Sequence, residues 1–193
     1  MRIISGVNKG RNLVDLGKGD PLAHLRPTSD RVRESIFNLI IGGRFGNKLE
    51  NCYILDMFAG TGALGLEALS RGAKSVLFVD NGQRAIQLLR KNISICGMEN
   101  KATIVKTDAT KKLPIPQKNS FDLVFIDPPY GKSLGQQALK ILEKCELLNN
   151  ETLIILEEGQ QINSFESFSI QDCRRYGGSY AHFLTPNMLQ RFT

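Results

Sequence analysis

The sequence predicts an α/β fold, in which helices cover both faces of a mostly parallel, seven-stranded sheet. After residue 50, short apolar runs alternate with segments of helical periodicity, the pattern of strands joined by crossover helices. A glycine-rich turn follows the first of these runs. The chain has 193 residues, of which 41% are hydrophobic, and this suffices to bury one sizeable core. We therefore expect a single compact unit.

Each expected element has a local signal. Before residue 50 we expect a short hairpin between Ile3 and Val14, then a helix that begins at a Thr28 cap and ends at Gly42. The later helices are expected near 63–71, 83–96 and 133–146, and the strands near 53–56, 75–79, 102–106, 123–126, 152–157, 167–173 and 180–184. The helix near 83–96 has apolar residues at i, i+3 and i+7. Residues 174–178 are expected to form a turn between the last two strands.

We expect three regions along the chain. Residues 1–48 form a basic hairpin and helix within the same compact unit, residues 49–186 form the main domain, and residues 187–193 form a tail. Residues 1–48 contain nine Lys and Arg against four Asp and Glu, an excess of +5 in a chain whose net charge is +6. Such a surface is typical of phosphate binding, although a merely solvated face is an open alternative.

The most informative motif is Asp127-Pro128-Pro129-Tyr130, which follows the apolar run Leu123–Ile126. An exocyclic amine on a base is a poor nucleophile because its lone pair is delocalised, so attack requires the nitrogen to become pyramidal. Acceptors at the Asp127 carboxylate and the Pro128 carbonyl would favour that change, while Tyr130 stacks on the ring. A strand that simply ends in a proline-rich turn is the alternative.

A second motif follows the first strand of the main domain. Gly60, Gly62 and Gly65 fit G-x-G-x-x-G, the spacing that lets a nucleotide-like ligand approach backbone at a helix N-terminus. Asp80, at the end of the next strand, is suited to accept hydrogen bonds from ribose hydroxyls. The loop residues expected at such a ligand are Phe58, Ala59, Gly60, Thr61, Gly62 and Gly65.

Asp56 decides between cofactors. Its charge would oppose a pyrophosphate but attract the ammonium and sulfonium of S-adenosylmethionine, so this cofactor is favoured over a nicotinamide dinucleotide. Asp56 could alternatively cap loop amides. Asp108 is expected to accept from the adenine amino group, with an ordinary turn aspartate as the alternative.

These segments resemble the RsmD family, bacterial guanine-N2 methyltransferases that act on small-subunit ribosomal RNA. The resemblance rests on Asp56–Gly65, Glu67–Ala73 and Phe121–Tyr130, and on a leading segment with Arg2–Gly6, Lys9–Arg11 and Arg26–Asn38. It implies a Rossmann-like class I methyltransferase fold, S-adenosylmethionine as cofactor, and ribosomal RNA or the assembling small subunit as partner. The basic residues expected to contact RNA are Arg2, Lys9, Arg11, Arg26 and Arg31.

Three other functions stay open. One is methylation of adenine N6 or of a glutamine amide, because the tetrapeptide suits any planar amine. The others are a non-catalytic RNA-binding assembly factor and a nicotinamide dehydrogenase, in which the tetrapeptide would have no role.

The remaining residues predict no metal site. Four cysteines and two histidines lack ligand spacing, so we expect free thiols and no metal. No apolar stretch approaches 18 residues and no leader peptide is evident, so a cytoplasmic monomer without membrane contact is expected.

Overall fold

A seven-stranded sheet forms the centre of the computed structural model, which describes residues 1–15, 29–111, 113–114 and 120–187. The strands lie in the order β3-β2-β1-β4-β5-β7-β6. The first five are parallel, and β7 and β6 complete the sheet as an antiparallel hairpin. The strands are β1 (Tyr53–Met57), β2 (Ser75–Asp80), β3 (Ala102–Lys106), β4 (Phe121–Ile126), β5 (Leu148–Glu158), β6 (Phe168–Tyr176) and β7 (Ser179–Pro186).

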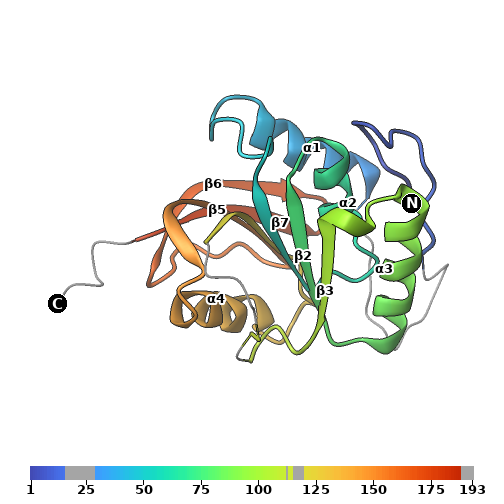
Figure 1. Cartoon of the computed structure of the whole chain (residues 1–193). Helices are drawn as coiled ribbons and strands as arrows, with labels where there is room; N and C mark the ends of the chain where they lie inside the picture. Colours follow the sequence, from blue (N-terminus) through green and yellow to red (C-terminus); the bar gives the residue numbers. More distant parts are fainter. Residues whose placement is uncertain (16–28, 112, 115–119, 188–193) are drawn as a thin grey trace.

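Helices cover both faces of this sheet, as the sequence predicts (Figure 1). The helices are α1 (Asp30–Ile41), α2 (Ala63–Ser70), α3 (Gln83–Cys96) and α4 (Leu134–Lys144), with a short 3-10 turn at Glu99–Lys101. One apolar cluster joins α1, α2 and α3 to alternate residues of the strands. The other cluster joins α4 to the residues between them, on the opposite face. None of the described helices is long and apolar enough to span a bilayer.

The expected strand alternation and the helices after residue 50 are confirmed, and the 83–96 helix coincides with α3. The start of α1 differs from expectation. Its N-cap is Ser29, whose hydroxyl accepts from the Val32 amide at 3.3 Å, so the Thr28 cap was wrong by one residue. Thr28 itself lies outside the described residues. The expected C-cap at Gly42 is confirmed by a hydrogen bond from its amide to the Asn38 carbonyl.

The N-terminal segment, residues 1–15, is only partly a hairpin. Its ladder consists of one isolated bridge between Arg2 and Asn12, with flanking bonds from Ile3 N to Arg11 O and from Leu13 N to Met1 O. Most of its remaining polar contacts are made with the helices instead. The segment is therefore fixed mainly by the surface on which it lies.

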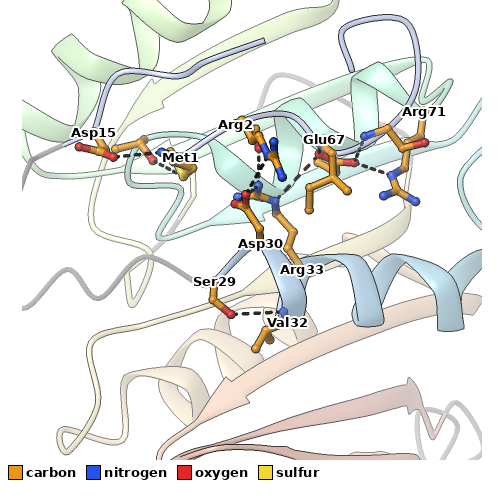
Figure 2. A network of polar contacts seen from close by, with 12 residues as sticks. Met1, Arg2, Asp15, Ser29, Asp30, Val32, Arg33, Glu67 and Arg71 are labelled. Carbon is orange, nitrogen blue, oxygen red and sulfur yellow. Dashed lines mark hydrogen bonds and ion pairs between the residues drawn. The ribbon is translucent and has the colours of Figure 1, made fainter. Parts of the chain in front are cut away.

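Glu67 of α2 is the main attachment point of this segment (Figure 2). Its fully buried carboxylate accepts from the Ile4 amide at 2.7 Å and from the Ser5 amide at 3.0 Å. It also pairs with Arg71 at 2.6 Å, and Arg33 of α1 approaches it to 4.0 Å. One carboxylate thus holds the N-terminal segment, α1 and α2 together.

Arg33 is the unexpected member of this group, because arginine is rarely fully buried. It is 0% exposed, and its guanidinium donates to the Arg2 carbonyl and to Asp30 at 3.0 Å. Burial lowers the pKa of Arg33, and the nearby Glu67 carboxylate opposes that change. Arg33 therefore contributes to internal structure, and its charge is not available to a phosphate.

Asn92 of α3 makes the second attachment. Its buried amide group accepts from the Val14 amide at 2.8 Å and donates to the Val14 carbonyl at 2.9 Å. The same group donates to the carbonyl of Thr61, in the glycine loop, at 2.9 Å. The end of the N-terminal segment and the glycine loop therefore share one side chain.

We predict that Glu67→Ala lowers the free energy of unfolding by about 3–5 kcal/mol, because it removes the acceptor of the Arg71 guanidinium and of two partly buried backbone amides, and takes a carboxylate away from the buried Arg33 charge. Urea unfolding followed by circular dichroism measures this change. Glu151→Ala is the matched control: that carboxylate is 83% exposed in its pair with Lys48, and its loss should cost about 1 kcal/mol or less. Equal effects of the two substitutions would contradict the role given to Glu67.

Candidate active site

The predicted site residues gather at one edge of the sheet. The strands β3, β2, β1 and β4 are parallel neighbours, so their carboxyl ends lie side by side. Asp108 follows β3, Asp80 is the last residue of β2, and the glycine loop and Asp127 follow β1 and β4. The sheet topology thus brings together four segments that are far apart in the sequence, at the edge where open α/β sheets bind ligands.

The glycine loop adopts an unusual backbone between β1 and α2. Phe58 has φ +59°, which is rare and costly for a residue with a side chain. Gly62, the N-cap of α2, has φ +83°. A Cβ at Gly65 would lie 2.3 Å from the Phe78 ring, so this glycine lets α2 pack closely on β2. Close helix–strand packing is the role of the third glycine in this spacing, and the approach of a ligand to the loop stays a prediction.

Asp56 is buried beneath this loop, with 2% of its surface exposed. Its carboxylate accepts from the Gly65 amide at 2.9 Å, near the start of α2. This is the cap that the sequence left as an alternative. Burial raises the pKa of Asp56 to about 7, and the Asp80 charge adds to that shift, while the bond from Gly65 opposes it. A contact between Asp56 and the methionine end of a cofactor stays a prediction.

Asp80 and Asp108 both bond to nearby backbone. Asp80 accepts from the Gly60 amide at 2.8 Å and from the Gly82 amide at 2.7 Å, one with each carboxylate oxygen. Each oxygen can accept one further hydrogen bond, so both keep an acceptor site for a ribose hydroxyl. Asp108 accepts from the Thr110 amide and hydroxyl, and the hydroxyl bond is the main cause that lowers its pKa. This is the geometry of a turn aspartate, the alternative given above.

The Asp127-Pro128-Pro129-Tyr130 segment leaves β4 directly after Ile126. Asp127 and Pro129 are partly buried, and Pro128 is buried close to α4. Tyr130 is one of the few large hydrophobic or aromatic side chains that the described residues expose, at 39%. The segment therefore combines a fixed backbone with an accessible ring.

Sequence reasoning missed the partners of that ring on β5 and β7. The Tyr130 hydroxyl donates to Glu157 Oε1 at 2.7 Å, and the Ser179 hydroxyl donates to the same oxygen at 2.9 Å. Burial, followed by the Glu157 charge, raises the pKa of Tyr130. Glu157 follows the apolar run Leu153–Leu156, so an acid at a strand end was the available signal.

The basic residues expected to contact RNA divide into three groups. Lys9 and Arg31 are exposed. Arg2 pairs with Asp30 at 3.2 Å, and the Arg11 guanidinium donates to the Ile95 carbonyl, although both residues are exposed. Arg26 lies outside the described residues. RNA contacts by these residues stay a prediction.

The described part of the chain contains no group of three or more His, Cys, Asp or Glu arranged to hold a metal ion. The residues at the edge of the sheet suit an adenosine ligand instead. They provide a glycine loop at a helix N-terminus, where a Cβ at Gly62 would lie 2.4 Å from Leu89, and a carboxylate at the end of β2. This arrangement fits the nucleoside part of a cofactor.

Comparison with known proteins identifies the family. The family model described as Conserved hypothetical protein 95 matches residues 1–185. The chain is 37% identical over 160 residues to the Ribosomal RNA small subunit methyltransferase D of Haemophilus influenzae, covering 81% of this chain and 78% of that protein. It is 38% identical over 159 residues to the protein of the same name from Escherichia coli K12, covering 81% and 74%.

A solved structure agrees with these matches. The protein yhhF from Escherichia coli superposes with a TM-score of 0.78 at 30% identity, covering 96% of this chain and 97% of that chain. Together with the sheet order, this confirms the predicted Rossmann-like α/β fold of class I methyltransferases.

We predict a pH-dependent stability difference between the wild type and Asp56→Asn. The folded protein keeps the Asp56 proton up to a pKa of about 7, whereas the unfolded chain releases it near 3.8. This group therefore stabilises the fold fully below pH 3.8, and that contribution is lost as the pH rises towards 7. The stability of Asp56→Asn relative to the wild type should rise between pH 4 and 7 and level off above. Urea unfolding at several pH values tests this, and parallel curves would contradict it.

Proposed function

The chain belongs to the RsmD family, and from this premise we propose that it transfers a methyl group from S-adenosylmethionine to the exocyclic N2 of a guanine in small-subunit ribosomal RNA. The observation that carries the proposal is the position of the Asp127–Tyr130 segment. It follows β4, whose parallel neighbour β1 leads into the glycine loop. A methyl donor at the loop and an amine at the tetrapeptide would therefore be adjacent.

The residues proposed to hold the cofactor are those of the glycine loop, with Asp80 for the ribose and Asp108 for the adenine. When bound, S-adenosylmethionine supplies an activated methyl group. The amides of Gly60 and Gly65 already donate to Asp80 and Asp56. These two acids thus set the shape of the loop, and the negative charge of Asp80 at this edge favours a cationic ligand.

Asp127 and Pro128 are proposed to orient the target amine. The Asp127 carboxylate and the Pro128 carbonyl accept from the two amine protons, which favours the pyramidal nitrogen needed for attack. Two consecutive prolines fix φ at both positions, so little backbone entropy is lost on holding these acceptors in place. Asp127 does not need to be a strong base, because the proton can leave after the carbon–nitrogen bond has begun to form.

The ring of Tyr130 is proposed to stack on the target base. A base within a duplex cannot reach a ring at the sheet edge, so the substrate must be a loop or a base turned out of its stack. Among the basic residues of the N-terminal region, exposed Lys9 and Arg31 are the best placed for phosphate contacts. Arg2 and Arg11 already bond to Asp30 and to the Ile95 carbonyl, and each would have to share or give up that bond to contact a phosphate. Ribosomal RNA, naked or in an assembling small subunit, is the proposed partner.

We predict N2-methylguanosine as the product of this protein. Small ribosomal particles that lack the modification are incubated with radiolabelled S-adenosylmethionine, and the labelled nucleoside is then identified by digestion and chromatography. Particles that already carry the modification are the control and should take up little label. Recovery of N6-methyladenosine would contradict guanine as the target base but would support methyl transfer to RNA. No label in RNA, despite cofactor binding by calorimetry, would reject the enzyme activity.

Two substitutions at Asp127 test how the amine is oriented. Asp127→Ala removes an acceptor used mainly in the transition state, so we predict a fall in turnover of about 10²-fold or more. Asp127→Asn keeps one acceptor oxygen, and we predict that it retains most of the turnover that alanine loses. Cofactor affinity should stay unchanged in both, as calorimetry would show. Equal losses in the two variants would mean that the charge, rather than an acceptor oxygen, is required.

A further inference from the structure

Tyr130 is held by its hydroxyl group, although its side chain is exposed. Its hydroxyl donates to Glu157 Oε1 at 2.7 Å, across 27 residues of sequence. On the ring itself, a Cβ at Gly159 would lie 3.4 Å from the ring atoms Cγ and Cδ2, so the backbone of Gly159 already adjoins the ring. The hydrogen bond thus restrains the ring at its far end, Gly159 lies beside its base, and part of the ring surface stays open.

The acceptor of this bond is itself fixed. Glu157 is 7% exposed and lies at the carboxyl end of β5, paired with Ala181 of β7. The buried Ser179 hydroxyl donates to the same oxygen at 2.9 Å. Rotation of the Glu157 carboxylate would break both bonds, so the two donors hold it in one orientation.

Glu157 has an energetic cost that a packing role does not explain. Its second oxygen, Oε2, is buried without a hydrogen-bond partner among the described residues. A buried carboxylate with an unpaired oxygen lowers stability relative to a neutral side chain of similar shape. Residues that carry such a cost are concentrated at functional sites.

We propose that Glu157, itself held by Ser179, is a positioning residue that fixes the Tyr130 ring through the phenolic hydroxyl and so presents one defined face to the target base. This inference rests on the proposed function, in which Tyr130 stacks on that base. A fixed ring gives the base a single stacked orientation, and therefore one direction from its amine to the methyl donor. A ring free to rotate would still bind a base but would present it in several orientations.

The first test separates orientation from binding. Tyr130→Phe keeps the ring and loses the bond, so turnover should fall about tenfold while the RNA dissociation constant changes by less than about threefold. Glu157→Ala should have the same effect, whereas Glu157→Gln, which keeps an acceptor oxygen, should recover most of the loss. Tyr53→Phe removes the same atom at the opposite edge of the sheet and is the matched control, with wild-type turnover expected.

The double variant Tyr130→Phe/Glu157→Ala decides whether the two residues act as one unit. If Glu157 acts through the hydroxyl, the double variant should be no slower than either single variant. A loss equal to the product of the single effects would overturn the proposal. Wild-type turnover in Tyr130→Phe would overturn it as well.

A measurement without RNA keeps this inference distinct from the proposed function. The four tyrosine rings are labelled with carbon-13, and the Tyr130 signal is identified by its absence in Tyr130→Phe. NMR relaxation should show a rigid Tyr130 ring in the wild type and a mobile one in Glu157→Ala. An unchanged ring order in Glu157→Ala would overturn the positioning role even in an active methyltransferase. A mobile ring in that variant, together with a wild type that labels no RNA, would reject the proposed function alone.

Discussion

Parallel strand pairing is the constraint on which the rest of this molecule depends. Because β3, β2, β1, β4 and β5 all run in the same direction, each of them delivers its next residues to the same edge. Strand direction alone therefore brings Asp80, Asp108 and the Asp127–Tyr130 segment to one edge of the sheet. Antiparallel β7 begins at this edge with Ser179, which adds a hydroxyl to the end of β5. The site is therefore a property of the topology, and the side chains adapt it to a particular chemistry.

The N-terminal segment is attached by a different principle, since its own ladder has only one bridge. A buried carboxylate, Glu67, replaces the missing strand partners by accepting two of its amides. Buried ion pairs seldom add much net stability compared with apolar contacts, but they penalise every arrangement that leaves a charge unpaired. The Glu67, Arg33 and Arg71 group thus selects one position for this segment. Within the segment, Lys9 and the Val7 side chain stay exposed, whereas Asn8 is buried against α2 and α3.

Local patterns predicted the fold well because strands and helices depend on nearby residues. The apolar spacing of Ile86, Leu89 and Ile93 located α3, and the glycine spacing located the turn before α2. Errors arose where a neighbour was chemically equivalent, as with Thr28 and Ser29, or where a distant residue decided the outcome. Nothing near Arg33 in the sequence identifies Glu67 as its buried partner. Glu157 was missed for the same reason, because its partners Tyr130 and Ser179 meet it only across the sheet.

The sharing of Asn92 between Val14 and Thr61 has a consequence for how the molecule can vary. One amide nitrogen donates to both carbonyls, so neither contact can be optimised without regard to the other. A displacement of the N-terminal segment therefore affects the glycine loop, and a displacement of the loop affects the segment. The coupling free energy is the same in both directions. Substitutions that move one of these regions are therefore expected to be accompanied by substitutions in the other.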